Sequence, residues 1–218
     1  EAVLKGTEVY SEDWRKHKDG HMIPVAIYGV PFQTPAGRMH VYAMYQDISE
    51  KKEREQELMR LSETDDLTGV FNRKKFEQDL RRELDIFHRY QWPSTLVMLD
   101  LDHFKRVNDG YGHQVGDRLL QEMTSCVLQD VRQTDILARW GGEEFIILVR
   151  YASRGEAVSL VERLRRNIEA TTFHCGLRVT CSFGLAQMQA GDSVRTLIKR
   201  TDDLLYTAKE RGRNRVEG

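Results

Sequence analysis

The chain has 218 residues, which is enough for one well-packed core and a smaller second module. Hydrophobic residues make up 40% of it, as in a globular protein, and no apolar run approaches the length of about 18 residues that a membrane-spanning helix needs. Its 33 basic and 34 acidic residues leave a net charge of -1, which argues against binding a nucleic-acid polymer or a membrane through bulk charge. Any anion site must therefore be a local cluster.

The cysteines and the N-terminus bear on the compartment. Cys126, Cys175 and Cys181 lack metal-ligand spacing, so we expect reduced thiols in or near the core of a cytoplasmic protein. The sequence shows no signal peptide. It begins with Glu1 rather than Met, which indicates that residues before it were removed and leaves membrane attachment upstream open.

Residues 1–48 contain two β-type runs, 22–30 and 38–45, separated by a turn at 34–37, which predicts an antiparallel sheet. Residues 14–25 (W-R-K-H-K-D-G-H-M-I-P-V) resemble the strand hairpin in the second half of a PAS sensor domain. Residues 45–52 (Y-Q-D-I-S-E-K-K) resemble the exit of that domain. Since a PAS domain has about 100 residues, the segment 1–48 is expected to be a partial, PAS-like sensor fragment.

Residues 49–63 form a highly charged, helix-forming segment with apolar residues only at Leu58, Met59 and Leu61. Its middle turns lack the apolar pairs that a coiled coil needs. Two interpretations stay open at this point: a solvated connector helix, and a signalling stalk that sets the relative rotation of two protomers.

From residue 64 to residue 218 the pattern becomes regular. Apolar spacing predicts a helix through Phe76 and Phe87, a buried strand at 95–99, a short helix from near Asp102 and a longer helix at 115–131. Then come a central hairpin, a helix that begins at Ser153 with Glu156 in a capping box, a strand at 177–186, and a last helix at 193–211 that Gly212 ends. The order β-α-α-β-β-α-β, with flanking helices, predicts an α+β fold built on a ferredoxin-like βαββαβ palm.

The central hairpin carries the sequence R-W-G-G-E-E-F at residues 139–145. Gly141 and Gly142 predict a two-residue turn, and their lack of side chains lets a bulky anion approach the backbone. Glu143 and Glu144 then alternate in direction as strand residues do, so one can meet a metal while the other meets something else. On the hairpin alone, a turn with two solvated acids is the favoured interpretation, and the metal site depends on the rest of the chain.

A second pair of acids lies where the buried strand ends, at Asp100 and Asp102. In a βαββαβ topology this end lies beside the central hairpin, so Asp100 and Glu143 are expected to converge. Together they offer hard oxygen ligands to Mg²⁺, which binds one or two protein carboxylates and completes its shell with water and phosphates. Asp102 either ligates the metal or caps the helix that follows it.

Four motifs, in order between residues 65 and 215, resemble those of one family. Residues 65–73 (D-D-L-T-G-V-F-N-R) resemble the opening D-x-L-T-G-L-x-N-R. Residues 99–109 (L-D-L-D-H-F-K-R-V-N-D) with 112–117 (G-H-Q-V-G-D) resemble D-x-D-x-F-K-x-x-N-D-x-x-G-H-x-x-G-D. Residues 139–145 are the GGEEF form of the GGDEF signature, and residues 206–214 (Y-T-A-K-E-R-G-R-N) resemble Y-x-A-K-x-x-G-R-N. The resemblance is to the diguanylate cyclases, which condense two GTP into cyclic di-GMP and release two pyrophosphates.

The resemblance implies a role for each motif residue. Asp100 and Glu143, with the Leu101 carbonyl, would hold Mg²⁺ or Mn²⁺, and Glu144 would be a further ligand or the proton acceptor. Asn108 and Asp117 would bind guanine, because a carboxylate accepts from its N1-H and 2-amino groups, which adenine lacks. The remaining binding positions would contact the triphosphate, Lys105 with a catalytic role as well: Phe104, Lys105, Gly141, Gly142, Lys209 and Arg213. Taken singly, Lys105, Lys209 and Arg213 are interpreted as solvated helix charges, and only their positions in the motifs favour the functional role.

The resemblance also implies regulation. Because one site binds one GTP, the enzyme is expected to act as a homodimer at the moment of reaction. Arg132 and Asp135 occupy the R-x-x-D offset of the family's product-inhibition site, and Arg163 matches a further arginine of it; an ordinary surface Arg-Asp pair is the alternative. A catalytically silent cyclic di-GMP receptor is the alternative function, and the intact signature beside Asp100 disfavours it.

Overall fold

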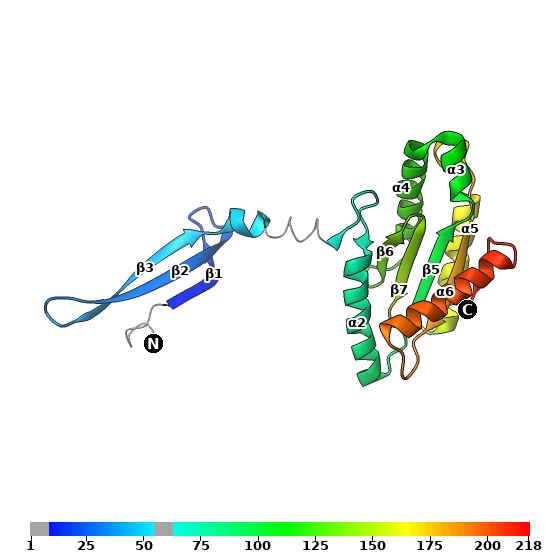
Figure 1. The fold of residues 1–218 in the computed structure, drawn as a ribbon. Coiled ribbons are helices and arrows are strands. Elements are labelled where there is room, and N and C mark those ends of the chain that lie inside the picture. The colour runs from blue at the N-terminus through cyan, green and yellow to red at the C-terminus, as the bar shows by residue number, and fades with distance from the viewer. Residues whose placement is uncertain (1–8, 55–62) are drawn as a thin grey trace. The chain divides into compact units, whose positions relative to one another are not determined.

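The structure is a computed structural model that describes residues 9–54 and 63–218. Contacts divide the chain into two compact units, residues 1–62 and 63–218 (Figure 1). Within the described residues, no helix has both the length and the apolar character required to cross a bilayer.

The N-terminal unit is an antiparallel sheet of three strands in the order β1-β2-β3. The strands are β1 (Val9–Lys16), β2 (Met22–Gln33) and β3 (Met39–Asp47). A helix begins at Ser49 and continues through Arg54, and the rest of the expected helix at 49–63 up to residue 62 lies outside the described residues. β3 is exposed along its whole length, whereas Val25, Ala26 and Ile48 are buried. The antiparallel sheet is confirmed; the PAS likeness stays a prediction.

The C-terminal unit contains a six-stranded mixed sheet in the order β4-β6-β7-β5-β8-β9. Its strands are β4 (Phe71–Asn72), β5 (Thr95–Leu101), β6 (Ile136–Gly141), β7 (Glu144–Val149), β8 (Cys181–Gln187) and β9 (Val216–Glu217). Its helices are α2 (Arg73–Tyr90), α3 (Phe104–Tyr111), α4 (His113–Asp130), α5 (Arg154–Ala170), the short η2 (His174–Gly176) and α6 (Val194–Glu210). The predicted order β-α-α-β-β-α-β, here β5-α3-α4-β6-β7-α5-β8, is confirmed as an α+β palm.

Two apolar clusters fill the space on either side of this sheet, because side chains alternate along each strand. Odd-numbered residues of β5, such as Val97 and Leu99, pack with α4 and α5. Even-numbered residues, such as Leu96 and Met98, pack with α2 and α6, which lie together on one face of the sheet (Figure 1). The same alternation decides which face each acid at the end of the strands occupies.

Several expected boundaries differ from those observed. The strand predicted at 177–186 begins only at Cys181, because β5, its partner, ends at Leu101, which pairs with Cys181. The short helix begins at Phe104 rather than near Asp102.

All three cysteines are free; Cys181 is buried and Cys126 half-buried, but Cys175 is exposed, so the expectation of a near-core thiol is wrong there. The capping box is confirmed: Glu156 accepts hydrogen bonds from the backbone N–H and the hydroxyl of Ser153.

The turn of the central hairpin lies one residue later than predicted. Gly141 pairs with Glu144, so Gly142 and Glu143 form the turn, and the register shifts between Arg139 and Gly141. A β-bulge inserts one extra residue into one strand, which moves the turn along the chain. Glu143 therefore belongs to the turn, and only Glu144 is a strand residue.

Candidate active site

The acidic centre of the site is a cross-strand pair. Asp100 on β5 and Glu144 on β7 are direct register partners, and both have the even numbering that faces α2 and α6. Two carboxylates are thus held side by side by the hydrogen bonds of the sheet rather than by flexible loops.

Lys209, in the last turn of α6, forms an ion pair with Asp100. Its Nζ is 2.8 Å from Asp100 Oδ2. Asp100 is only 7% exposed. Its burial raises the pKa of the carboxyl to about 6, with Glu143 and Glu144 adding to the rise and Lys209 opposing it. Burial also raises the pKa of Glu144. The site therefore has more buried negative charge than one lysine neutralises, which favours a bound cation.

The tip of the hairpin is braced by two residues for which the sequence analysis gave no role. Arg139 donates from Nε to the Gly142 carbonyl at 2.9 Å and from Nη1 to Asp65 at 3.2 and 3.3 Å. Asp65 also accepts from the backbone N–H and hydroxyl of Thr68. The opening motif thus connects to the GGEEF turn through one ion pair. The motif spacing was visible in the sequence, but the pairing of Asp65 with Arg139 needed the fold.

The acidic residues of the site can supply the ligands that a divalent ion needs. The carboxylate oxygens of Asp100, Glu143 and Glu144 do not all lie within 4.8 Å of one another. The ligand atoms of His17, Asp19 and His21 in the N-terminal hairpin do. The Asp100–Glu144 pair alone supplies the one or two carboxylates that Mg²⁺ uses. The turn stays close to this pair, since the Leu101 N–H approaches the Glu143 carbonyl at 3.4 Å. Hard carboxylate oxygens suit Mg²⁺ or Mn²⁺, so the residues present fit such an ion.

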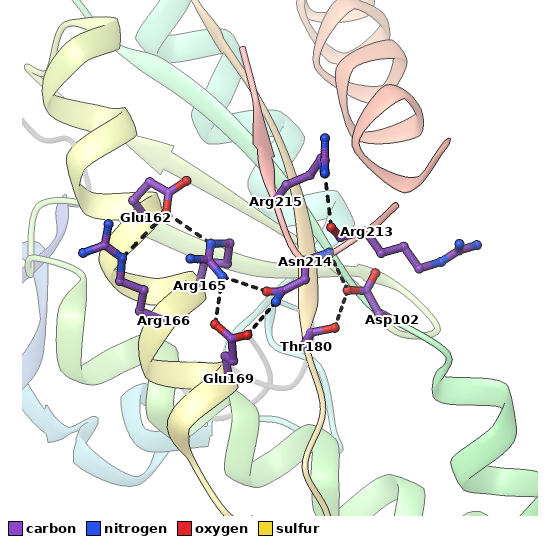
Figure 2. Close-up of polar contacts among 9 residues, drawn as sticks. All are labelled: Asp102, Glu162, Arg165, Arg166, Glu169, Thr180, Arg213, Asn214 and Arg215. Atoms are coloured by element: carbon purple, nitrogen blue, oxygen red, sulfur yellow. Dashed lines mark hydrogen bonds and ion pairs between the residues drawn. The ribbon is translucent and has the colours of Figure 1, made fainter. Parts of the chain in front are cut away.

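Asp102 does not cap the helix that follows it. The residue before α3 is His103, and no side chain caps that helix. Asp102 instead accepts from the hydroxyl of Ser182 at 2.7 Å. It also accepts from the hydroxyl of Thr180 at 2.6 Å and from the Asn214 N–H at 3.0 Å (Figure 2). The cap interpretation is therefore wrong, because the carboxylate is directed toward β8 and the segment after α6.

The residues predicted to bind guanine lie on α3 and α4. Asn108 Oδ1 is buried and has no hydrogen-bond partner, whereas Asp117 is exposed. A Cβ at Gly116 would lie 1.9 Å from Asn108 Oδ1 and 3.1 Å from Phe104. Only glycine at position 116 leaves room for this arrangement. A buried, unpaired amide oxygen is costly, which is typical of a group that has its partner in a ligand.

The residues predicted to contact phosphates lie at the start of α3, at the tip of the central hairpin and at or beyond the end of α6. Phe104 and Lys105 begin α3, whose first N–H groups carry no side-chain cap, and Lys105 is exposed. Arg213 is exposed beyond the end of α6. Uncapped N–H groups at a helix start attract anions.

The residues of the predicted product site are only partly brought together. Asp135 accepts from the backbone N–H of Arg132 at 3.0 Å and from that of Arg150 at 3.2 Å. Arg163 donates from Nε to Asp130 at 2.8 Å. Arg132 and Arg163 both line a cavity of about 250 Å³, while Asp135 lines a neighbouring one of about 330 Å³. The two arginines thus line one cavity. Arg163 is held by Asp130, for which the sequence predicted no role.

Comparison with known proteins gives consistent matches. Residues 62–215 match the family model described as "Diguanylate cyclase, GGDEF domain". The chain is 40% identical over 157 residues to diguanylate cyclase DgcP of Pseudomonas aeruginosa, covering 71% of this chain and 23% of that protein. It is 36% identical over 194 residues to diguanylate cyclase DgcM of Escherichia coli K12, covering 84% of this chain and 46% of that protein. The chain therefore spans less than half the length of these curated relatives.

A solved structure agrees with the sequence matches. The coiled coil and GGDEF domain of DgcB from Caulobacter crescentus, in complex with c-di-GMP, superposes with a TM-score of 0.75 at 28% identity. The match covers 78% of this chain and 92% of that one.

Proposed function

The chain belongs to the diguanylate cyclase GGDEF family, and from this premise we propose that it condenses two molecules of GTP into cyclic di-GMP with release of two pyrophosphates. The observation that carries the proposal is the cross-strand pair of the buried Asp100 and the half-buried Glu144, with Lys209 at the end of α6 paired to Asp100. The two carboxylates would hold the metal ion, and the Lys209 ammonium group would add positive charge, where the ribose hydroxyl of one GTP attacks the α-phosphate of another.

Asp100 and Glu144, with the Leu101 carbonyl and Glu143 from the turn, would hold Mg²⁺ or Mn²⁺. A bound ion of this class lowers the pKa of the ribose 3′-hydroxyl and neutralises charge on the phosphates. Glu144 would be a further ligand of the ion or the acceptor of the hydroxyl proton. Gly141 at the end of β6 and Gly142 in the turn are exposed, and their lack of side chains would give the phosphates access to the backbone.

The guanine is proposed to bind between α3 and α4. The Asn108 oxygen, buried and unpaired, would accept from the base, and Asp117 would accept from its N1-H and 2-amino groups. Adenine offers neither donor in this arrangement, so GTP is the expected substrate over ATP. Lys105, Lys209 and Arg213, together with the first N–H groups of α3 at Phe104, would hold the triphosphate.

The reaction requires two such sites face to face. Each site holds one GTP, so we propose a two-fold dimer in which each protomer presents its hydroxyl to the partner's phosphate. The segment at 49–63 would then control how often the two sites meet. An activity per protomer that stays constant as the protein is diluted through dissociation would contradict the dimer.

Product is proposed to inhibit at Arg132, Asp135 and Arg163, away from the acidic pair. Arginine forks suit both phosphates and the O6/N7 edge of guanine, and the shared hollow supports the pairing of the two arginines. Inhibition at this site would not be competitive with GTP.

One experiment tests the proposed reaction. The protein is incubated with GTP or ATP in the presence of Mg²⁺ or of EDTA, and pyrophosphate and cyclic dinucleotide are measured. We expect both products from GTP with Mg²⁺ and neither from ATP or with EDTA. Binding of cyclic di-GMP without any turnover of GTP would instead support the silent receptor.

A further inference from the structure

The segment after α6 adopts an uncommon backbone. Arg213 and Asn214 are consecutive non-glycine residues in the left-handed region, with φ of 63° and 47°. L-residues rarely adopt this conformation, and it persists where surrounding contacts determine it. The contacts that determine it here come from two different parts of the C-terminal unit.

The first contact is with the end of β5. The Asn214 N–H donates to Asp102 Oδ2 at 3.0 Å. Asp102 is 5% exposed and also binds the hydroxyls of Thr180 and Ser182. One buried carboxylate thus joins three segments: the end of β5, the start of β8 and the chain after α6 (Figure 2).

The second contact is with α5. Arg165 donates from Nη1 to Asn214 Oδ1 at 2.9 Å, and Asn214 Nδ2 donates to Glu169 Oε1 at 2.7 Å. Arg165 and Glu169 are themselves paired at 2.9 Å. The hydrogen bond from Asn214 is the main reason that the pKa of Glu169 lies below its ordinary value. Both ends of the Asn214 amide group are therefore used, and its side chain is fixed (Figure 2).

We propose that Asn214, held by Asp102 on one side and by Arg165 and Glu169 on the other, is a positioning residue for the nucleotide phosphates. It fixes the backbone that carries Arg213, whose side chain is directed away from the Asn214 amide group (Figure 2). We call the hydrogen bonds of Asn214 with Asp102, Arg165 and Glu169 the clamp. Because Asp102 follows Asp100 by two residues, the clamp connects the backbone at Arg213 to the end of β5, the strand that carries Asp100. This inference rests on the proposed function, because it assigns Arg213 to phosphate.

A structural role alone would make Asn214 important for stability but would not couple it to Arg213. The test is therefore a double-mutant cycle on the full chain, with binding of a non-hydrolysable GTP analogue as the measurement. We expect Arg213→Ala to weaken binding about tenfold in the parent chain, as loss of a charge-assisted hydrogen bond does, and less than about twofold in the Asn214→Ala background. Additive losses would overturn the proposal.

The matched control is Asn167→Ala. Asn167 also lies on α5 and donates to a carboxylate, that of Asp130 at 2.7 Å, whereas the hydrogen bonds of Asn214 are with Asp102, Arg165 and Glu169. Its effect should add to that of Arg213→Ala. If Asn214→Ala fails to fold, Asn214→Gly replaces it. Glycine adopts the left-handed backbone without steric cost and keeps the N–H that donates to Asp102. In that variant, retention of the full tenfold effect of Arg213→Ala would overturn a role for the side chain.

The inference and the proposed function fail in different ways. If the parent chain binds neither GTP nor its analogue, the proposed function fails, and amide hydrogen exchange tests the clamp instead. Exchange at residues 213–215 should be faster in Asn214→Ala than in the parent and in Asn167→Ala. Unchanged exchange at these residues would show that Asn214 does not hold the segment.

Discussion

The acidic end of β5 and the arginine surface around Arg132 and Arg163 position their side chains by different means. Asp100 is 7% exposed, lies opposite Glu144 through strand register and is paired with Lys209. Arg132 and Arg163 are exposed, and Arg163 is held by a single acid, Asp130. Buried strand register fixes a site before any ligand arrives, whereas exposed arginines need the ligand to complete their arrangement.

The largest effect that this contrast predicts is at Asp100. Asp100→Asn removes one of the two facing carboxylates while keeping the size of the side chain, so cyclic di-GMP formation should fall by about 100-fold or more. The measurement is initial rate at saturating GTP and Mg²⁺. Asp85→Asn, an exposed acid on α2, is the control and should keep the parent rate. Activity of Asp100→Asn within a few-fold of the parent would remove the acidic pair from the mechanism.

The second effect concerns Gly116, which lies against the Asn108 oxygen. Gly116→Ala places a methyl group where Asn108 now lies, with a Cβ–Oδ1 separation of 1.9 Å before any shift. The Asn108 amide must move, and we expect GTP binding to weaken by about tenfold, the scale of a lost hydrogen bond. Gly155→Ala is the control, since a Cβ there meets nothing within 4 Å. Equal GTP affinity in both variants would show that Asn108 does not contribute to guanine binding.

The third effect belongs to the arginine surface. Arg132→Ala should weaken inhibition by cyclic di-GMP about tenfold, because an arginine fork to phosphate is lost, while the uninhibited rate stays the same. Arg166→Ala is the control: it lies on α5 like Arg163, but it is exposed and does not line the hollow. The measurement is the product concentration that halves the rate. An unchanged value in Arg132→Ala would leave the R-x-x-D pair as an ordinary surface contact.

The same contrast explains how much the sequence could predict. Alternating and helical apolar patterns correctly placed the core helices and the strand that carries Asp100, because burial of those residues determines the fold. The pattern could not locate the bulge before Gly141, which moved Glu143 into the turn, since a one-residue shift leaves the apolar spacing intact. Nor could it assign Asp102, whose hydroxyl and N–H donors come from about 80 to 110 residues further along the chain.

The smallest effect is on stability, and its sign follows from the pKa of Asp100. The folded chain holds the Asp100 proton up to a pKa of about 6, whereas the ordinary value is 3.8. Between these values the folded state binds more protons than the unfolded state, so the free energy of unfolding falls as pH rises. Asp100→Asn lacks this proton exchange. In Mg²⁺-free buffer we therefore expect the variant to gain stability relative to the parent between pH 4 and pH 7.

The gain should be about 1–2 kcal/mol, allowing for partial solvent screening of the carboxylate. Urea unfolding at several pH values measures it, with Asp85→Asn and Arg132→Ala as controls whose differences from the parent should not vary over this range. Each is exposed, so neither buries a charge. A difference between Asp100→Asn and the parent that is flat with pH would mean that Asp100 is ionised at no cost. The acidic end of β5 would then be no more strained by its charge than the exposed arginine surface, and the contrast between the two sites would rest on geometry alone.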